Sequence, residues 1–503
     1  MQKAQPTSAY DNLETHFRRV GHLQHIAAIT GWDEAAMMPA GGGAARADAM
    51  AALSTTIHQL ICDDRLQDWL TDAGADNKLT DWQRANLREM QRTWSRSRAL
   101  PDNLVSRLSS VSVRCEQAWR GLREANDWLG VQPLLDELLN LTREKAQRLG
   151  DLKDLSPYDA LLDEYEPGLT STVVSDWFNQ LKSFLPDMVD RVMERQNTIP
   201  AEMPTGPFPA EQQRTLGLKL MEALGFDFAH GRLDVSHHPF CGGVPDDVRI
   251  TTRFNEQNFL EGLMGVLHET GHAMYEQGLP KPWRNQPVGE ALGMAVHESQ
   301  SLLVEMQTCR SREFLTFAAP LMREAFGADG QDPAWSAENL YRLSTRVRRG
   351  LIRVDADELT YPLHVILRFE LEKPLLEGSL SVADLPDAWD AGMRALLGRP
   401  TDDNYRDGVM QDVHWYAGLV GYFPTYTVGA MTAAQWFQSA RAAIEDLPGQ
   451  ISEGDFRPLL DWLRHNIHSQ GRLHSAQSLI TAATGSPLDP GIFRSHLERR
   501  YLG

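Results

Sequence analysis

His268 and His272 lie four positions apart with Glu269 between them, and this pattern constrains the chain more than any other. On an α-helix, residues four apart lie on one face, about one turn from each other. Two imidazoles so placed can bind one Zn²⁺, while the glutamate lies beside the ion and can take a proton from its water. The H-E-x-x-H (HExxH) pattern therefore predicts a metal site. The alternative is that these are two helix histidines that hydrogen-bond to ordinary polar partners and bind no metal.

The surrounding sequence predicts that the pattern lies on a helix over residues 256–277. Asn255 is a suitable N-cap, and Gly278, followed by two prolines, is a suitable end. Apolar residues recur at helical spacing before the histidines, namely Phe259, Leu260, Leu263, Met264 and Leu267.

A third ligand would distinguish a catalytic metal site from a chance pattern. The H-E-x-x-H-x-x-G-x-x-H arrangement requires glycine and histidine where this chain has Tyr275 and Gly278, so that class is excluded. The remaining candidates are two glutamates on a following helix, Glu290 and Glu298.

Glu298 is the better candidate because of its helical context. It lies next to His297 in an apolar helical run, where a buried carboxylate costs several kcal/mol unless it is paired or bound to metal. Glu290 lies near the predicted helix start, where acids are ordinary surface residues. We therefore predict one zinc ion per chain, with Co²⁺ or Mn²⁺ as possible substitutes, held by His268, His272 and Glu298. Two histidines, one glutamate and water form an open, catalytic set.

The rest of the chain reads mostly as helices. A β-branched and glycine-containing stretch over residues 233–255 predicts a small β element just before the metal helix. The proline-rich residues 198–212 predict an exposed connection or hinge. We expect one catalytic unit over residues 1–503, with helices of 1–200 packed against the metal-bearing 201–503. The predicted helices span residues 12–31, 81–98, 104–124, 131–150, 170–195, 213–224, 289–312, 337–349, 357–372 and 432–446.

Composition excludes several classes of protein. The 42% hydrophobic and 23% charged residues are typical of a soluble globular protein. A formal charge of −19 makes nucleic acid and anionic membranes poor partners. The four cysteines are far apart, the N-terminus lacks the apolar core of a signal peptide, and no apolar run reaches membrane-spanning length. The expected location is the cytoplasm.

Several ordered motifs together resemble the carboxypeptidase Taq family of metallocarboxypeptidases. Besides the metal motif they are H-P-F at 238–240, D-x-R-x-T at 247–251, H-E-S-Q at 297–300, G-x-x-Q-D-x-H-W at 408–415 and the W-D-x-x-x-M-M-P stretch within 31–42. The resemblance covers most of the chain. It implies a mostly α fold with a long substrate groove covered by the N-terminal region, a homodimer, and removal of C-terminal residues from peptides with broad specificity. One departure is Val354, where the family usually has Ser or Thr.

The resemblance also implies roles for individual residues. Glu269 would act as the general base. His414 and Tyr422 would donate hydrogen bonds to the tetrahedral intermediate, with Tyr426 as the alternative to Tyr422. An aromatic core role is the competing interpretation for Tyr422.

A carboxypeptidase also needs a group that binds the substrate's free carboxylate. The planar fork of an arginine suits this task, and the resemblance points to Arg353. The competing interpretation is a structural ion pair of Arg353 with Asp355, Asp357 or Glu358. Arg249 is the second candidate, although we expect it to pair with Asp247 and stabilise the sheet. His238 would line the substrate site or hold a turn.

Two other functions remain open at this point. A helical zinc endopeptidase or oligopeptidase would use the same metal ligands without a carboxylate clamp. A metal-stabilised scaffold would bind the ion without hydrolysis, but such a protein has no need of Glu269.

Overall fold

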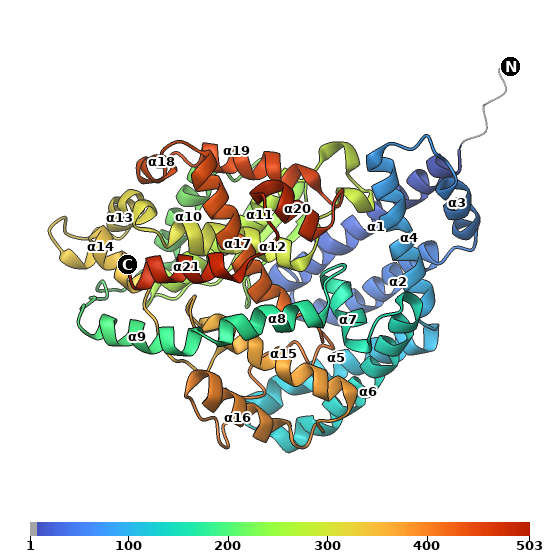
Figure 1. Cartoon of the computed structure of the whole chain (residues 1–503), viewed down its shortest axis with the longest axis horizontal. Helices are drawn as coiled ribbons and strands as arrows, with labels where there is room; N and C mark the ends of the chain where they lie inside the picture. The colour runs from blue at the N-terminus through green and yellow to red at the C-terminus, as the bar shows by residue number, and fades with distance from the viewer. Residues whose placement is uncertain (1–7) are drawn as a thin grey trace.

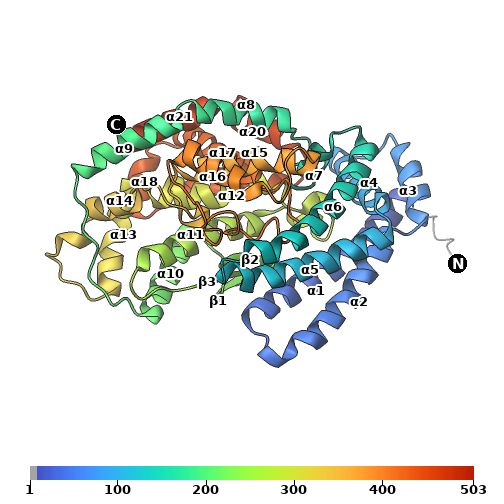
Figure 2. The same ribbon diagram turned by 90° about the horizontal axis from the view of Figure 1, so that it is seen from below.

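The computed structural model describes residues 8–503, and most of them are helical. Four of the first nine helices, α1, α4, α6 and α7, begin with a side-chain N-cap, and Ser8 and Thr80 each form a capping box. Helices α1 to α4 lie at one end of the molecule, as Figures 1 and 2 show. The nine helices are α1 (Ala9–Ala36), α2 (Gly43–Ile61), α3 (Arg65–Gly74), α4 (Asp81–Ala99), α5 (Asp102–Glu124), α6 (Trp128–Lys153), α7 (Pro157–Tyr165), α8 (Ser171–Lys182) and α9 (Leu185–Asn197).

The remaining helices include the predicted metal helix, α11, which packs against α10 and α12. Helices α13 and α14 lie at the end of the molecule opposite α1 to α4 (Figures 1 and 2). The helices are α10 (Ala210–Leu224), α11 (Phe259–Gly278), α12 (Met294–Leu302), α13 (Arg312–Ala325), α14 (Ala337–Ser344), α15 (Tyr361–Glu377), α16 (Leu385–Leu397), α17 (Pro424–Ala443), α18 (Leu447–Glu453), α19 (Arg457–Asn466), α20 (Ala476–Thr484) and α21 (Pro490–Tyr501).

A small sheet precedes α11, as predicted. Its strands are β1 (Gly231–Val235), β2 (Phe240–Val244) and β3 (Asp247–Thr252), in the order β1-β3-β2. Strand β1 runs parallel to β3 and β2 runs antiparallel to it. Val248 and Ile250 of β3 are buried in a cluster with Val266 and Ala273 of α11. The sheet therefore packs against the helix that carries the histidine pair.

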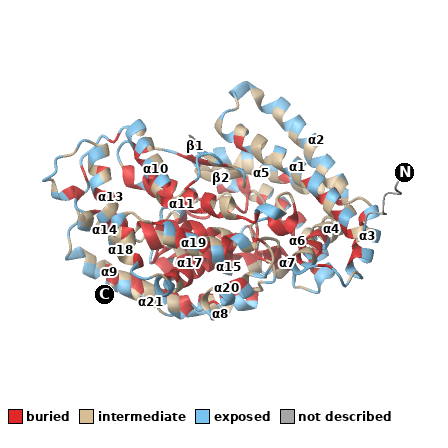
Figure 3. Ribbon diagram, turned by 90° about the horizontal axis from the view of Figure 1, so that it is seen from above, coloured by how far each residue is buried: buried red, intermediate tan, exposed pale blue. Residues whose placement is uncertain are grey.

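The main hydrophobic core extends from Leu104 on α5 to Tyr501 at the end of α21. Figure 3 shows that buried residues concentrate in α11, α15 and α17, which lie in the middle of the molecule. A second, smaller core joins α1, α3 and α4. No helix within residues 8–503 is long and apolar enough to cross a membrane.

Several predicted boundaries were wrong. The expected single helix over 170–195 is two helices. Pro186 has no N–H to bond to the carbonyl of Lys182, where α8 ends, and it lies instead in the first turn of α9. Helix α11 begins at Phe259, so Asn255 is not its N-cap. Instead, the Asn255 side chain accepts a hydrogen bond from Gln257 N in a turn.

Several helix ends in the second half of the chain also differ from the predicted ones. The helix predicted over 289–312 begins only at Met294 and continues as a π-helical segment, Leu303–Cys309. The helix predicted at 337 ends at Ser344, five residues early, and the one predicted at 357 begins at Tyr361. Helix α17 begins at Pro424, eight residues before the predicted start, because proline is well suited to a first helical turn.

Candidate active site

His268 and His272 on α11 meet Glu298 on α12. One ligand atom from each of the three side chains lies within 4.8 Å of the other two, and this is the only such group of His, Cys, Asp or Glu found among residues 8–503. Glu298 is buried, and its Oε2 lies 3.5 Å from Nε2 of His272. The three donors are of the types and number that a catalytic zinc site uses.

Glycines allow the helices that carry these ligands to approach closely. A Cβ atom placed on Gly271, between the two histidines, would lie 2.6 Å from Cα of Ser301 on α12. A Cβ atom on Gly429 of α17 would lie 2.9 Å from Cβ and Cγ of Glu298. Helix α11 therefore packs against the backbone of α12, and α17 packs against the Glu298 side chain, at distances that only glycine permits.

Hydrogen bonds orient both imidazole rings. Nδ1 of His268 lies 2.9 Å from Oε2 of Glu305, whose other oxygen accepts from Arg310 at 2.7 Å. Nδ1 of His272 lies 3.1 Å from the carbonyl oxygen of His297 and 2.6 Å from its Nδ1. When each Nδ1 carries the proton and donates, each Nε2 keeps a free lone pair, which is the form that binds a metal.

A further hydrogen bond orients the ring of His297. Its Nε2 lies 2.9 Å from Oε1 of Glu276 on α11. If His297 donates its proton there, its Nδ1 can accept from His272. The carboxylate of Glu276 thus completes a hydrogen-bonded series that leads away from the metal ligands.

The electrostatics of the site fit a cation. Glu269, Glu298 and Glu305 place three carboxyl groups around the two histidines, and all three are buried. Burial, opposed by His268 and reinforced by Glu298, raises the pKa of Glu269 to about 7. Burial lowers the pKa of His272, and the charges of His297 and His268 lower it further. A divalent cation would compensate the clustered carboxylates. His272 already favours the neutral form that binds a metal. At His268, burial is outweighed by the hydrogen bond to Glu305 and the charge of Glu298, which raise its pKa to about 10, so a bound ion would displace a proton there.

Glu290 lies outside this cluster. Its carboxylate pairs with Arg472 at 2.9 Å, and its side chain is 48% exposed. The geometry therefore agrees with the preference for Glu298 as the third ligand.

The family assignment follows from sequence comparison. A family model described as carboxypeptidase Taq (M32) metallopeptidase matches residues 12–501. The chain belongs to the carboxypeptidase Taq family. Curated relatives include thermostable carboxypeptidase 1 of Thermus thermophilus, which is 40% identical over 508 residues and 99% of each chain. Another is carboxypeptidase 1 of Bacillus subtilis, 32% identical over 96% of each chain.

Solved structures agree with this assignment. Trypanosoma cruzi metallocarboxypeptidase 1 is 41% identical and superposes with a TM-score of 0.96, covering 98% of this chain and 99% of that one. A Pyrococcus furiosus carboxypeptidase is 30% identical with a TM-score of 0.94, covering 99% and 100%. The mostly helical fold with its small sheet is thus confirmed as that of the carboxypeptidase Taq family, and the chain is a metallocarboxypeptidase.

A second group of predicted residues in this carboxypeptidase comes from the segment after α16. Nε2 of His414 lies 3.0 Å from the hydroxyl of Tyr426, while its buried Nδ1 has no hydrogen-bond partner within residues 8–503. The ring of Tyr422 lies 5.5 Å from that of His414 and 5.2 Å from that of Tyr426. Burial, with the charge of Arg353, lowers the pKa of His414 to about 3, so the imidazole is neutral.

Arg353 joins this group, but its ion-pair partner differs from those we expected. Asp355, Asp357 and Glu358 were the partners named in the competing interpretation; the Arg353 guanidinium instead binds Asp412, with Nη2 2.9 Å from Oδ1. Local spacing could not predict this pair, because the two residues are 59 positions apart.

Arg353 is not fully neutralised by that contact. Arg368 binds the same Asp412 at 2.6 Å, so two guanidinium groups share one carboxylate and a net charge of +1 remains. Arg353 also lies 4.7 Å above the ring centroid of Tyr426. Its positive charge lowers the pKa of Glu298, although burial outweighs it and raises that pKa overall. The Arg353 charge therefore acts on Glu298, one of the candidate metal ligands.

The two other predicted residues lie elsewhere. Arg249 pairs with Asp247 at 2.7 Å, as predicted, and also lies 4.3 Å above the ring of Trp32 on α1. His238 lies in the exposed turn between β1 and β2, where its carbonyl accepts from the Ser236 hydroxyl. Val354, the departure from the family pattern, is 66% exposed, so no buried group depends on a hydroxyl there.

Sequence reasoning missed Glu305 and Asp412 as supports of the site. Glu305 lies seven residues after Glu298, two helical turns on, and this spacing was a usable signal. Asp412 lies within the G-x-x-Q-D-x-H-W motif but had not been assigned a role.

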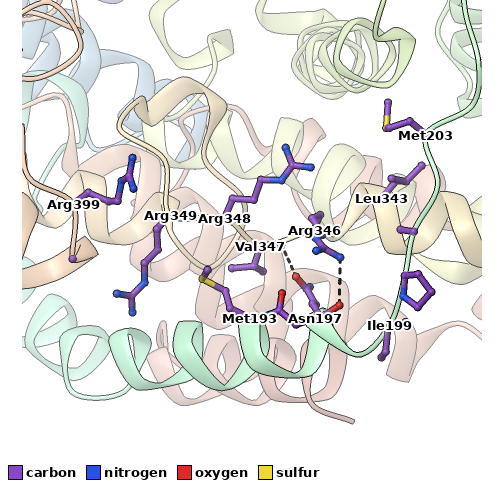
Figure 4. A pocket seen from close by; sticks show the side chains of 14 residues that line it. Met193, Asn197, Ile199, Met203, Leu343, Arg346, Val347, Arg348, Arg349 and Arg399 are labelled. Carbon is purple, nitrogen blue, oxygen red and sulfur yellow. Dashed lines mark hydrogen bonds between the residues drawn. The ribbon is translucent and has the colours of Figure 1, made fainter.

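A separate cavity of about 710 Å³ lies between the C-terminal end of α9 and residues 343–349 (Figure 4). Arg346 extends to α9, where it donates to the carbonyl oxygen of Gln196, and Arg349 pairs with Asp190. Arg348 and Arg399 extend away from α9. None of the predicted site residues lines this cavity, so it is not part of the candidate site.

Proposed function

We propose that this chain removes C-terminal amino acids from peptides with broad specificity, using one zinc ion and a glutamate base. The observation that carries the proposal is the convergence of His268, His272 and Glu298 beside buried Glu269. Stabilisation of the intermediate and binding of the substrate's carboxylate are assigned to the group formed by His414, Tyr422, Tyr426 and Arg353.

His268, His272 and Glu298 would hold the metal, with Glu305 and His297 orienting the two rings. A Zn²⁺ ion in such a site lowers the pKa of water to about 7 and polarises a carbonyl group. Co²⁺ or Mn²⁺ accept the same nitrogen and oxygen donors and are possible substitutes.

Glu269 is the proposed general base. Its pKa, raised to about 7 by burial, makes the carboxylate a proton acceptor matched to neutral pH. Having accepted a proton from water, the same carboxyl group would deliver it to the leaving amine.

His414 and Tyr422 are the proposed donors to the oxyanion of the tetrahedral intermediate. His414 is neutral and shares its Nε2 with the Tyr426 hydroxyl. Tyr426 would therefore orient His414, or replace Tyr422 as the second donor.

Arg353 is the proposed partner of the substrate's terminal carboxylate. The surplus positive charge of the Arg353, Asp412 and Arg368 group would attract an anion in a low-dielectric site. Asp412 occupies the Nε and Nη2 side of the fork, and Nη1 donates to the Tyr361 hydroxyl at 3.3 Å. The substrate would therefore bind the remaining N–H groups at the Nη1 and Nη2 end. His238, in its exposed turn, would contact a more distant part of the peptide.

The proposed function is tested by incubating metal-loaded protein with mixed peptides and reading the products by mass. We expect ladders that shorten by single residues from the C-terminus and that disappear when metal is removed with a chelator. We also propose a homodimer, as the family resemblance implies, and a cytoplasmic location, as the dispersed cysteines imply. Fragments cut at internal positions would indicate an endopeptidase, and intact peptides would indicate a scaffold.

A further inference from the structure

Glu372 on α15 is a fully buried carboxylate, 1% exposed, that accepts three hydrogen bonds. The indole Nε1 of Trp415 donates to Oε1 at 2.9 Å. The backbone N–H of Gly421 donates to Oε2 at 3.1 Å, and the hydroxyl of Tyr158 on α7 donates to the same oxygen at 2.7 Å. No ion pair of Glu372 with an arginine, lysine or histidine forms within residues 8–503. Such a charge is expensive to bury, and the three donors offset part of that cost.

Two of the donors to Glu372 are sequence neighbours of the proposed oxyanion donors. Trp415 directly follows His414, and Gly421 directly precedes Tyr422. One carboxylate therefore holds both ends of residues 414–422, the segment that carries both proposed oxyanion donors.

This segment needs such anchors. Residues 414–422 lie between α16 and α17 and consist of turns, without the hydrogen-bond ladder of a helix or sheet. Arg368, one helical turn before Glu372 on α15, binds Asp412 at the start of the same region. Helix α15 thus contacts the segment through side chains at three points, of which Glu372 supplies two.

We propose that Glu372 is a positioning residue for the reaction, which sets the locations of His414 and Tyr422 through Trp415 and Gly421. This inference rests on the roles proposed above for His414 and Tyr422. Glu372 itself acts only through its neighbours. Because a displacement of about 1 Å in a catalytic group can lower turnover by about a hundredfold, loss of the anchor should be measurable in kcat.

The primary test is Glu372→Gln in the metal-loaded protein. An amide cannot accept from both Trp415 and Gly421, because one of its two ends is a donor. We expect kcat to fall by about tenfold to a hundredfold, with KM and metal content unchanged. Tyr158→Phe is the matched control: it removes a hydrogen bond from the same carboxylate but none from residues 414–422, and it should change kcat by less than about threefold. Equal losses in both variants would overturn the proposal.

A second measurement separates positioning from general stability. In a His414→Ala, Tyr422→Phe background, Glu372→Gln should cause no further loss of kcat, because the groups that it positions are already absent. A full additional loss there would overturn the inference and leave the roles of His414 and Tyr422 intact. If His414→Ala, Tyr422→Phe itself keeps wild-type turnover, the proposed donors are wrong, which is a distinguishable failure.

Hydrogen exchange gives a readout independent of turnover. Glu372→Gln should speed exchange of the Gly421 amide and its neighbours, while α11 and α12 stay protected. Unchanged exchange at Gly421 would overturn the proposal. If Glu372→Gln fails to fold, Trp415→Phe replaces it, since this change removes one anchor and leaves the carboxylate in place. The same loss of kcat is then expected.

Discussion

Gly271 on α11 and Ser301 on α12 are so close that a Cβ atom on the glycine would lie 2.6 Å from the serine Cα. The near atom belongs to backbone, which cannot move aside as the end of a side chain can. This contact occurs between the two histidines of one helix and one turn after Glu298 of the other. The close approach of the two helices thus brings the third candidate ligand within reach of the first two.

Gly271→Ala should therefore weaken metal binding. Separating α11 from α12 should destabilise the fold by about 1–3 kcal/mol and lower metal affinity by about tenfold to a hundredfold. Gly265→Ala is a matched control on the same helix, because a Cβ there meets nothing within 4 Å. That control should bind metal normally and be stabilised by about 0.5–1 kcal/mol. Competition with a chelator measures both affinities, and equal affinities would contradict the account.

The choice between two glutamates gives a second prediction. Glu298→Gln replaces an anionic ligand with a neutral amide and should release most of the metal on dialysis, whereas Glu290→Gln should retain it. Glu290 pairs with Arg472 instead, so its loss affects a partly exposed ion pair. Metal content by elemental analysis decides the matter. A full metal content in Glu298→Gln beside a reduced one in Glu290→Gln would mean that the third ligand has been misassigned.

Glu269→Gln should preserve the fold and the metal while lowering kcat by about 10²- to 10⁴-fold, since the amide cannot accept a proton from water. The measurement is steady-state turnover of a peptide at full metal occupancy, with the melting temperature as the control for folding. Turnover near that of the wild type would remove Glu269 from the reaction.

The sequence predicted the central helix and the small sheet because each depends on local spacing, and the same reasoning selected the three candidate ligands that lie together in the structure. His268 and His272 share a helical face by periodicity alone, and the carboxylate of Glu298 stood out in an apolar run. Contacts between distant segments were beyond such reasoning. The Arg353–Asp412 pair and the anchors of Glu372 join segments tens of residues apart, and nothing in local spacing encodes them. Helix ends also differed from prediction, as at Pro424, which begins α17 eight residues before the predicted start.

Glu372 also gives a prediction about pH and stability. Burial, opposed by its three hydrogen bonds, raises its pKa from the ordinary 4.5 to about 7. Between those values the folded protein binds a proton that the unfolded chain does not, so this group stabilises the fold as pH falls from about 7 towards 4.5. The free energy of unfolding of the wild type, relative to Glu372→Gln, should rise by about 2 kcal/mol from pH 8 to pH 5.5. Urea denaturation of both metal-free proteins tests this, and a difference independent of pH would contradict it.

Arg353→Ala should depress cleavage of free-acid peptides by about 30- to 1000-fold in kcat/KM, as expected for loss of a charged contact worth about 2–4 kcal/mol. Arg353→Lys should restore only part of this, because a point charge cannot reproduce the fork. The melting temperature of each variant shows whether loss of the Arg353–Asp412 ion pair destabilises the fold. Asp412 keeps its ion pair with Arg368 in these variants. Equal losses on free-acid substrates and on any residual cleavage of amides would give Arg353 a structural role, and Arg249 would be the next candidate.

The central claim, removal of residues from a free C-terminus, is tested most directly with one peptide in two forms. The metal-loaded wild-type protein is incubated with the free acid and with the C-terminal amide, and the products are read by mass over time. We predict stepwise loss of single residues from the acid and an intact amide. Cleavage of both forms at the same rate, or at an internal bond, would contradict the account.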